Sequence, residues 1–189
     1  DWSSDVCSSD LSTQVNSSEI NAMPIPSLDK INEWGNQLLY SGDFSTEGCD
    51  KIMEVILMKN VDEARKILFS IGMPKAQQSD LCCYSLLALA GLAPDSEWTD
   101  STENWLRIHD IIEFTKDKYD VVYAENSRET FRKQAMHHFR TAAVIEDNGK
   151  PTNSPHYRYR LTWEMLKLIR SFNTVLWDEE LTAFLSMIS

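Results

Sequence analysis

Residues 126–170 constrain the fold most, because they carry a helix, a strand, a turn-forming loop, a strand and a helix in that order. The first segment has an apolar stripe at spacings of four, four and three residues, which is the period of a helix. The stripe consists of Phe131, Ala135, Phe139 and Ala142. Asn126 precedes it as a candidate N-cap, and Glu129 stands where a capping box would place it. This order predicts the second half of a winged helix-turn-helix.

The segments after this helix would form the wing. Residues 143–146 suit a short strand, whereas residues 147–155, with one glycine and two prolines, cannot continue a helix or a ladder. The side chains then alternate, with Tyr157, Tyr159 and Leu161 on one side and His156, Arg158, Arg160 and Thr162 on the other. We therefore expect a two-stranded ribbon with a basic outer face, after which Thr162 caps a further helix.

Apolar stripes elsewhere predict the helices against which this half would pack. The expected helices cover residues 60–71, 79–90, 105–119 and 178–187. Asn60 is the expected N-cap of the first, with Glu63 in its third position, and Gly91 ends the second. Residues 120–125 would form the turn of the helix-turn-helix. The predicted fold class is mainly α, a helical bundle ending in a winged helix-turn-helix with a small two-stranded β wing.

The N-terminal part adds little to this architecture. Residues 1–11, DWSSDVCSSDL, read as the translation of a sequencing adapter, and we expect them to play no part in the fold. Residues 12–59 are expected to be mobile or are poorly placed by their pattern, with Met23 as a plausible true start and Ser27 as the cap of a short helix. The helical DNA-binding domain is expected over residues 60–189.

The charges of the chain are unevenly distributed. The formal net charge is −11, yet residues 126–160 hold seven Arg or Lys against three acidic residues, a local charge of +4. A basic patch on an acidic body focuses a polyanion onto one face. A run of charge can also be no more than a solvated face, but the order of helix and wing favours nucleic acid.

The outward side of residues 126–142 and the wing supply the candidate DNA contacts. Thr130, Lys133, Gln134 and His137 share one patch at helical spacing. Gln134 can bond an adenine bidentately and Lys133 can reach guanine acceptors, whereas the arginines and Lys150 are expected to hold phosphates. The full candidate set is Arg128, Thr130, Arg132, Lys133, Gln134, His137, Lys150, Asn153, Arg158 and Arg160.

The sequence contains no convincing catalytic or metal-binding pattern. His137 and His138 are adjacent, whereas a zinc pair on a helix needs a spacing of three or four. Asp110, Glu113 and Asp117 are interleaved with lysines and are more typical of a solvated helix face. The four cysteines make no paired C-x-x-C pattern, so we expect a reduced, cytoplasmic protein. No apolar run reaches the roughly 18 residues that a membrane span requires.

Three segments carry a more specific pattern: MPKAQQSDLCCYSLLALAGLAPDSEW (73–98), NSRETFRKQAMHHF (126–139) and GKPTNSPHYRYRLTWEMLKLIRSF (149–172). Together they resemble the N-terminal helix-turn-helix part of the BsuBI/PstI family of type II restriction endonucleases, over roughly residues 61–185. The resemblance implies a homodimeric, Mg²⁺-dependent enzyme that cuts a short palindromic hexamer in double-stranded DNA. It also implies a separate C-terminal catalytic domain of the PD-(D/E)xK type.

The chain departs from the family pattern where the chemistry would lie. In the family's catalytic domain acidic groups hold the metal and a lysine helps to activate water. No lysine here has Asp or Glu two positions before it. We therefore expect this chain to be a fragment without the catalytic domain, to carry no cofactor itself, and to leave Mg²⁺ to the missing domain. The expected partners are double-stranded DNA and, in the full-length protein, a second copy, with no membrane.

Two other functions remain open. A free-standing winged-helix transcriptional regulator would need no catalytic domain, and the fold alone cannot choose because winged helices are widely reused. A winged helix that binds only proteins would suit the net charge of −11. The segment PTNSPHYRYRLT matches the endonuclease pattern and favours the first interpretation, although the helix before it could still only pack while the catalytic half reads the bases.

Overall fold

The computed structural model describes residues 35–36, 39, 42 and 45–188. The expectations about the adapter-like segment, Met23 and a helix capped by Ser27 lie outside the described residues. Within the described part no helix combines the length and apolar character that a membrane crossing needs.

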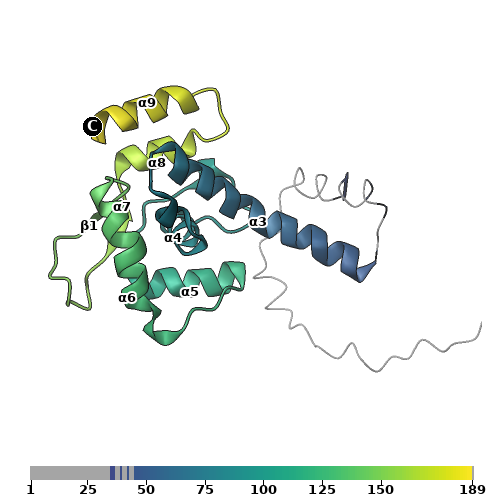
Figure 1. The fold of residues 1–189 in the computed structure, drawn as a ribbon, viewed down its shortest axis with the longest axis horizontal. Helices are drawn as coiled ribbons and strands as arrows, with labels where there is room; N and C mark the ends of the chain where they lie inside the picture. Colours follow the sequence, from purple (N-terminus) through teal and green to yellow (C-terminus); the bar gives the residue numbers. More distant parts are fainter. Residues whose placement is uncertain (1–34, 37–38, 40–41, 43–44, 189) are drawn as a thin grey trace, which may run out of the picture.

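The described elements are mostly helical, with one small antiparallel sheet (Figure 1). The α-helices are α3 (Thr46–Ser70), α4 (Asp80–Ala90), α5 (Ile108–Tyr119), α6 (Arg128–Phe131), α7 (His137–Thr141), α8 (Trp163–Arg170) and α9 (Trp177–Ile188). The short turns are η1 (Lys75–Gln78), η2 (Trp98–Asp100), η3 (Glu125–Ser127) and the π-helical turn η4 (Arg132–Met136). The strands are β1 (Ile145–Asp147) and β2 (Tyr159–Leu161). The predicted fold class is confirmed.

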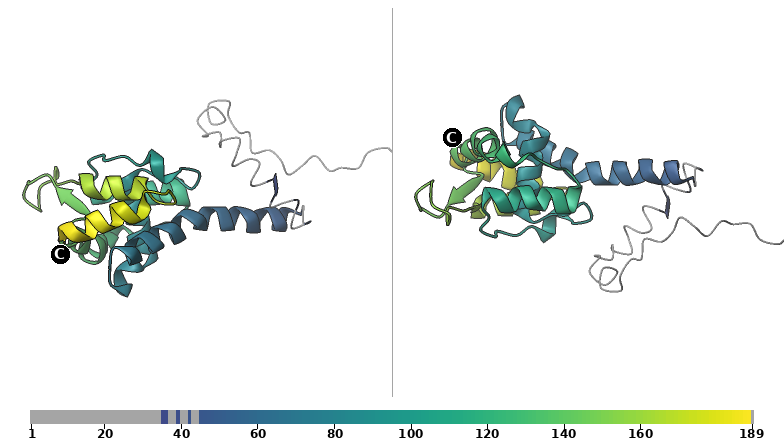
Figure 2. Two further views of the ribbon diagram at one scale, coloured as in Figure 1. Left: turned by 90° about the horizontal axis from the view of Figure 1, so that it is seen from above. Right: turned by 90° about the horizontal axis from the view of Figure 1, so that it is seen from below.

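Helix α3 passes straight through the position where the sequence indicated its start. Asn60 is therefore not an N-cap. It lies within the helix, is buried, and donates from Nδ2 to the carbonyl oxygen of Ala93 at 2.9 Å. Glu63 likewise closes no capping box but accepts from the indole Nε1 of Trp98 at 2.8 Å. Figure 2 shows the N-terminal half of α3 extending beyond the remaining helices, while its C-terminal half packs on α4.

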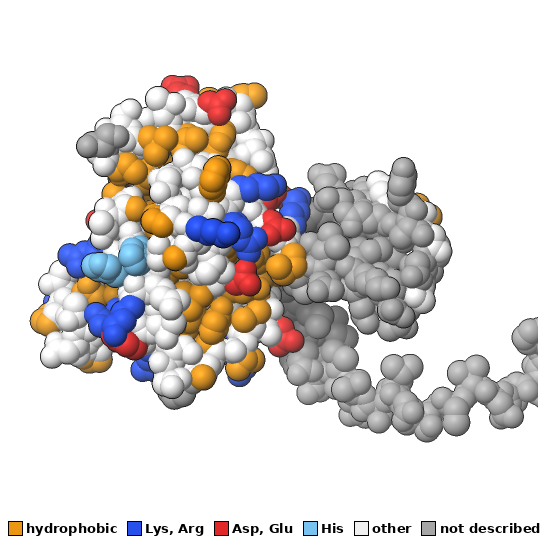
Figure 3. All heavy atoms as spheres, viewed as in Figure 1, with side chains coloured by type: hydrophobic (Ala, Val, Ile, Leu, Met, Phe, Trp, Pro, Cys, Tyr) orange, Lys and Arg blue, Asp and Glu red, His pale blue; other side chains and the backbone are white. Residues whose placement is uncertain are grey.

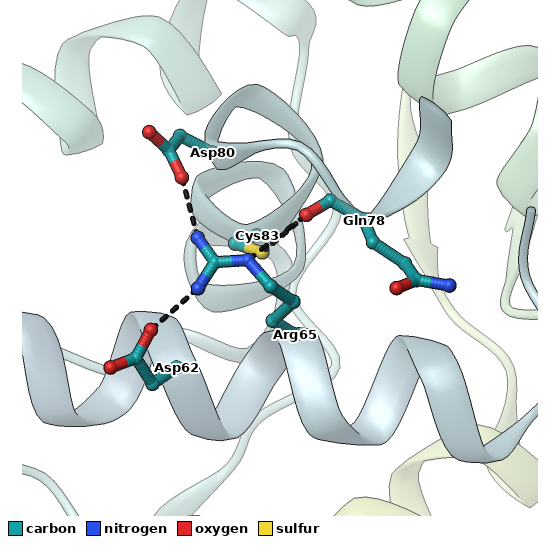
Figure 4. A network of polar contacts seen from close by, with 5 residues as sticks. All are labelled: Asp62, Arg65, Gln78, Asp80 and Cys83. Carbon is teal, nitrogen blue, oxygen red and sulfur yellow. Dashed lines mark hydrogen bonds and ion pairs between the residues drawn. The ribbon is translucent and has the colours of Figure 1, made fainter. Parts of the chain in front are cut away.

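The junction of α3 and α4 is fixed by one arginine (Figure 4). The Arg65 guanidinium donates to Asp62 on its own helix and to Asp80 at the start of α4. Its Nε also donates to the carbonyl oxygen of Gln78 at 3.1 Å, and the Cys83 thiol lies against the same oxygen. The guanidinium therefore links α3 to the start of α4 before the winged part of the chain begins.

Helix α4 forms the centre of the core, as its apolar composition predicts. Every residue of α4 from Cys82 to Ala90 is buried. The helix ends where expected at Gly91, which adopts the left-handed conformation with φ 71° and donates its backbone N–H to the last turn. The hydroxyl of Thr102 lies close to this glycine, at 2.7 Å from the position that a Cβ would occupy.

The first helix of the helix-turn-helix is shorter than predicted. The helical spacing suggested a start near Trp105, but α5 begins at Ile108. Leu106 instead pairs with Tyr159 in an antiparallel bridge, with both N···O distances at 2.8 Å. This isolated bridge adds a single paired residue beside the two-stranded sheet, and the sequence pattern did not reveal it because one residue leaves no periodicity.

The helix predicted over residues 126–142 is one continuous rod made of α6, η4 and α7. It begins at Arg128, and Asn126 lies in the preceding turn η3, so the predicted capping box is wrong. The predicted apolar stripe is confirmed at Phe131, Ala135 and Phe139, which have no exposed surface. A π turn winds with more residues per turn than an α-helix, and it brings Met136 to the buried side as well.

The wing follows directly from this helix. Strand β1 starts two residues later than predicted, because Ala143 takes a left-handed conformation with φ 54°. Its residues Ile145, Glu146 and Asp147 pair with Leu161, Arg160 and Tyr159 in that order. Thr162 caps α8 as predicted, accepting from the backbone N of Met165 at 3.2 Å. Helix α9 then packs on α8.

Candidate nucleic-acid interface

The outward side of the α6–η4–α7 rod carries the predicted base-reading residues. Thr130, Lys133, Gln134 and His137 are all exposed, whereas the inward side is fully buried. The structure therefore brings the four residues to one face, as the helical spacing predicts. Cys82 on α4 lies behind this face and its thiol donates to the backbone carbonyl of Gln134 at 3.5 Å.

Two cations on this face share one carboxylate. Arg132 donates from Nε and Nη2 to Glu129 at 2.8 and 2.6 Å, and Lys133 Nζ lies 3.2 Å from the same carboxylate. The hydrogen bond from Arg132, followed by that from Lys133, lowers the pKa of the Glu129 carboxyl to about 2. The carboxylate therefore stays charged at any neutral pH, and part of the positive charge predicted for this face is neutralised locally.

Two hollows lie between the rod and the wing. The larger, of about 580 Å³, is lined by polar side chains of Arg107, His109, Asn126, Arg128, Glu129, Arg132, Thr152 and Ser154, together with Tyr157 and Tyr159. The smaller, of about 230 Å³, is lined by Arg132, Lys133, Met136, His137, Arg140, Thr152, Tyr157 and Tyr159. In Figure 3 the visible histidine side chains lie with some of the basic side chains on the side of the molecule where α6 and α7 are, and another group of basic side chains lies toward the middle of this face.

The wing arginines differ in how strongly they are held. Arg160 donates from Nε to Glu146 at 2.6 Å, and its Cζ lies 4.5 Å from the centroid of the Trp105 ring. Arg158 is half-buried and lies near Asp110. Burial of the Asp110 carboxyl raises its pKa, but the hydrogen bonds and charge of Arg107, helped by the charge of Arg158, outweigh this effect and hold the pKa below its ordinary value.

The tip of the wing is ordered by its own side chains. Asn148 donates from Nδ2 to the carbonyl oxygen of His156 at 2.7 Å across the loop. Gly149 supplies the left-handed position at φ 67° that the turn requires. Lys150 and Asn153 are exposed beyond it. These two candidates therefore lie at the tip, away from the hollows.

The structure adds residues that the sequence reasoning missed. Arg140 lines the smaller hollow, one turn beyond His137, and helical spacing could have identified it. Arg107 and His109 line the larger hollow because α5 begins at Ile108. No local signal could have identified them, since their position depends on where Leu106 pairs with the wing.

The described residues do not form a metal site. Among them no group of three or more His, Cys, Asp or Glu side chains stands together in a way that could hold a metal ion. The Mg²⁺ that the family resemblance implies was expected in the catalytic domain outside this chain, and no metal-assisted step is assigned to the described residues.

The order of α4, the Leu106 bridge, α5, the α6–α7 rod and the β1–β2 ribbon defines a winged helix-turn-helix. The chain belongs to the family described as the BsuBI/PstI restriction endonuclease HTH domain, which matches residues 58–189. The resemblance seen in the sequence is thereby confirmed.

Individual relatives support this assignment. The chain is 39% identical over 131 residues to the type II restriction enzyme BsuBI of Bacillus subtilis, covering 67% of this chain and 42% of that enzyme. It is 25% identical over 127 residues to the type II restriction enzyme AplI of Arthrospira platensis, covering 66% and 39%. The solved structure of the SdaI restriction endonuclease matches with a TM-score of 0.65 at 33% identity, covering 68% of this chain and 42% of that one. The chain thus spans about two fifths of the length of these relatives.

Proposed function

We propose that this chain binds double-stranded DNA and serves as the recognition module of a type II restriction endonuclease. The observation that carries the proposal is the pair of hollows between the α6–α7 rod and the wing, whose lining includes five Arg or Lys and two His side chains. Such a lining attracts phosphate. Membership of the restriction endonuclease HTH family and the names of the relatives support the same conclusion.

In the proposed complex the rod enters the major groove and the wing follows the adjoining phosphate backbone. The exposed side chains of Thr130, Gln134 and His137 would then face base edges. Gln134 is the best base reader, because its amide can bond N6 and N7 of one adenine. We place the phosphates in the two hollows and along the wing, where Arg158 and Lys150 lie.

The basic candidates are not equivalent as phosphate ligands. Arg158 and Lys150 have no ion pair among the salt bridges between described residues, whereas Arg132 and Arg160 are already paired with Glu129 and Glu146. A phosphate must compete with those carboxylates. We therefore assign the stronger phosphate contacts to Arg158 and Lys150 of the wing.

For the complete enzyme we propose Mg²⁺-dependent cleavage by a homodimer. We assign the chemistry to parts of the enzyme other than the described residues, whose side chains form no metal-binding group. For the chain itself we propose binding without cleavage.

The binding proposal is tested by fluorescence anisotropy of a random-sequence duplex with the purified chain at several salt concentrations. We expect binding that weakens linearly on a double-logarithmic salt plot, because each neutralised phosphate releases counterions. Arg158→Ala should lower that slope by about one. Lys66→Ala removes the same charge from the exposed side of α3, in neither the rod nor the wing, and should leave the slope unchanged. Binding that is absent or independent of salt would contradict the proposal.

Base reading is tested separately with Gln134→Ala. The wild-type chain first selects a preferred duplex from a randomised pool. Gln134→Ala should bind that duplex about 1–3 kcal/mol more weakly than the wild-type chain does, and should bind random duplex almost as well. Equal affinity of the wild-type chain for selected and random duplexes would reject base reading by this helix. It would leave the phosphate contacts standing.

A further inference from the structure

An acidic side chain stands in the middle of the proposed DNA interface. Among the described residues that line the two hollows, Glu129 is the single carboxylate, in a lining with five arginines or lysines. Its side chain is about half exposed and lies in the first turn of α6. A charge at this position faces the same solvent that DNA would displace.

This carboxylate opposes binding to any phosphate backbone. It stays ionised, as its low pKa shows, and its charge repels phosphates within a Debye length. It also occupies Arg132 and Lys133, two cations that would otherwise contact the backbone directly. A surface that only needed to hold phosphates would bind more tightly without it.

A role of Glu129 in stabilising the start of α6 does not explain the geometry of its contact with Arg132. An acidic residue in a first turn does favour the helix dipole, and Glu164 has that position in α8. Glu129 differs because both of its oxygens accept from the Arg132 guanidinium, in the two-point geometry that fixes the plane of an arginine. Arg132 lines both hollows.

We propose that Glu129 is a specificity-determining residue of the interface, which holds Arg132 in one orientation and presents a carboxylate oxygen to the base edges. The inference rests on the proposed function. An oriented guanidinium donates to guanine O6 and N7, and a carboxylate accepts from a cytosine amino group. A base step that offers neither group brings the carboxylate near the phosphate backbone without a base contact to offset the repulsion, and binding there is penalised.

The test compares Glu129→Gln with the wild-type chain and with Glu164→Gln. The last variant removes a first-turn charge from α8, outside the hollows. Anisotropy on a random-sequence duplex should show Glu129→Gln binding about threefold more tightly at low salt, since one repulsive charge is gone. Selection from a randomised duplex pool should show weaker base preference at one position. Glu164→Gln should match the wild-type chain in both measurements.

A shorter acid separates charge from positioning. Glu129→Asp keeps the repulsion but cannot hold Arg132 at the same distance. Its affinity for random duplex should stay close to the wild-type value while its selected sequences lose the same base preference. The inference is overturned if both Glu129 variants select the wild-type sequence, or if Glu129→Gln binds random duplex no more tightly. A wild-type chain that binds no duplex would instead reject the proposed function, and the inference with it.

Discussion

At the scale of single residues, Gly91 is the position where the backbone leaves least choice. Its φ of 71° is rarely adopted by other residues, and a Cβ would stand 2.7 Å from the Thr102 hydroxyl. We expect Gly91→Ala to lower the free energy of unfolding by about 1–3 kcal/mol, as judged from strained left-handed residues. Urea titration with a linear extrapolation measures the change.

Gly72→Ala is the matched control for this prediction. Gly72 has a similar φ of 79°, but no atom lies within 4 Å of its added Cβ. Both variants carry the backbone strain, and only the first meets Thr102. Equal losses for the two would show that the close approach of Thr102 adds nothing.

Single residues also show where reasoning from the sequence ends. An Asn followed three residues later by Glu has the same local pattern whether it caps a helix or lies inside one. In this protein the loop after α4 supplies the carbonyl acceptors for Asn60, and Trp98 supplies the donor for Glu63. Those partners are distant in sequence, so tertiary packing decides the role of both side chains.

At the scale of elements, the α6–α7 rod is stabilised by the aromatic side chains on its inward face. Phe131 and Phe139 are fully buried, and the ring of Phe131 packs edge-on against that of Tyr123, with the ring centroids 4.8 Å apart. Truncation of either to Ala should cost roughly 3–5 kcal/mol of unfolding free energy, since it leaves a cavity. Urea titration should show the loss, and Phe69→Ala should lie within about 0.5 kcal/mol of wild type because Phe69 is largely exposed. A loss below about 1 kcal/mol for Phe139→Ala would mean that the core refills the space.

The elements were predictable where periodicity was long and uninterrupted. The stripes of α4 and of the α6–α7 rod repeat over several turns, and both helices were located correctly. The start of α5 was not located correctly. Trp105 fits the apolar spacing of that helix, but it contacts Arg160 of the wing, and Leu106 bridges Tyr159. The exposed face of the rod could be inferred from spacing alone. The pairing of Arg160 with Glu146 and Trp105 depends on strand register, which that spacing does not determine.

At the scale of the whole molecule, the adjacent thiols of Cys82 and Cys83 report on global unfolding. Both are fully buried, and burial raises the pKa of the Cys83 thiol to about 12, so very little thiolate exists near neutral pH. We expect iodoacetamide at pH 8 to modify the peptide containing both residues only as fast as the protein unfolds. Peptide mapping by mass spectrometry separates this peptide from those of Cys7 and Cys49.

The denatured chain provides the control for that measurement, since both thiols should react promptly in urea. Prompt alkylation of the same peptide in the native protein would show that α4 opens locally, which its central place in the core argues against.

The bridge between Leu106 and Tyr159 has a consequence for the order in which the chain folds. It joins two positions on either side of the whole helix-turn-helix through two backbone hydrogen bonds. Closing so long a loop costs chain entropy before any contact forms, whereas α3 and α4 meet through a short connection. Non-local strand contacts of this kind form late. The ribbon would then be assembled last, and its buried side chains Ile145, Tyr159 and Leu161 would complete a core that the helices begin.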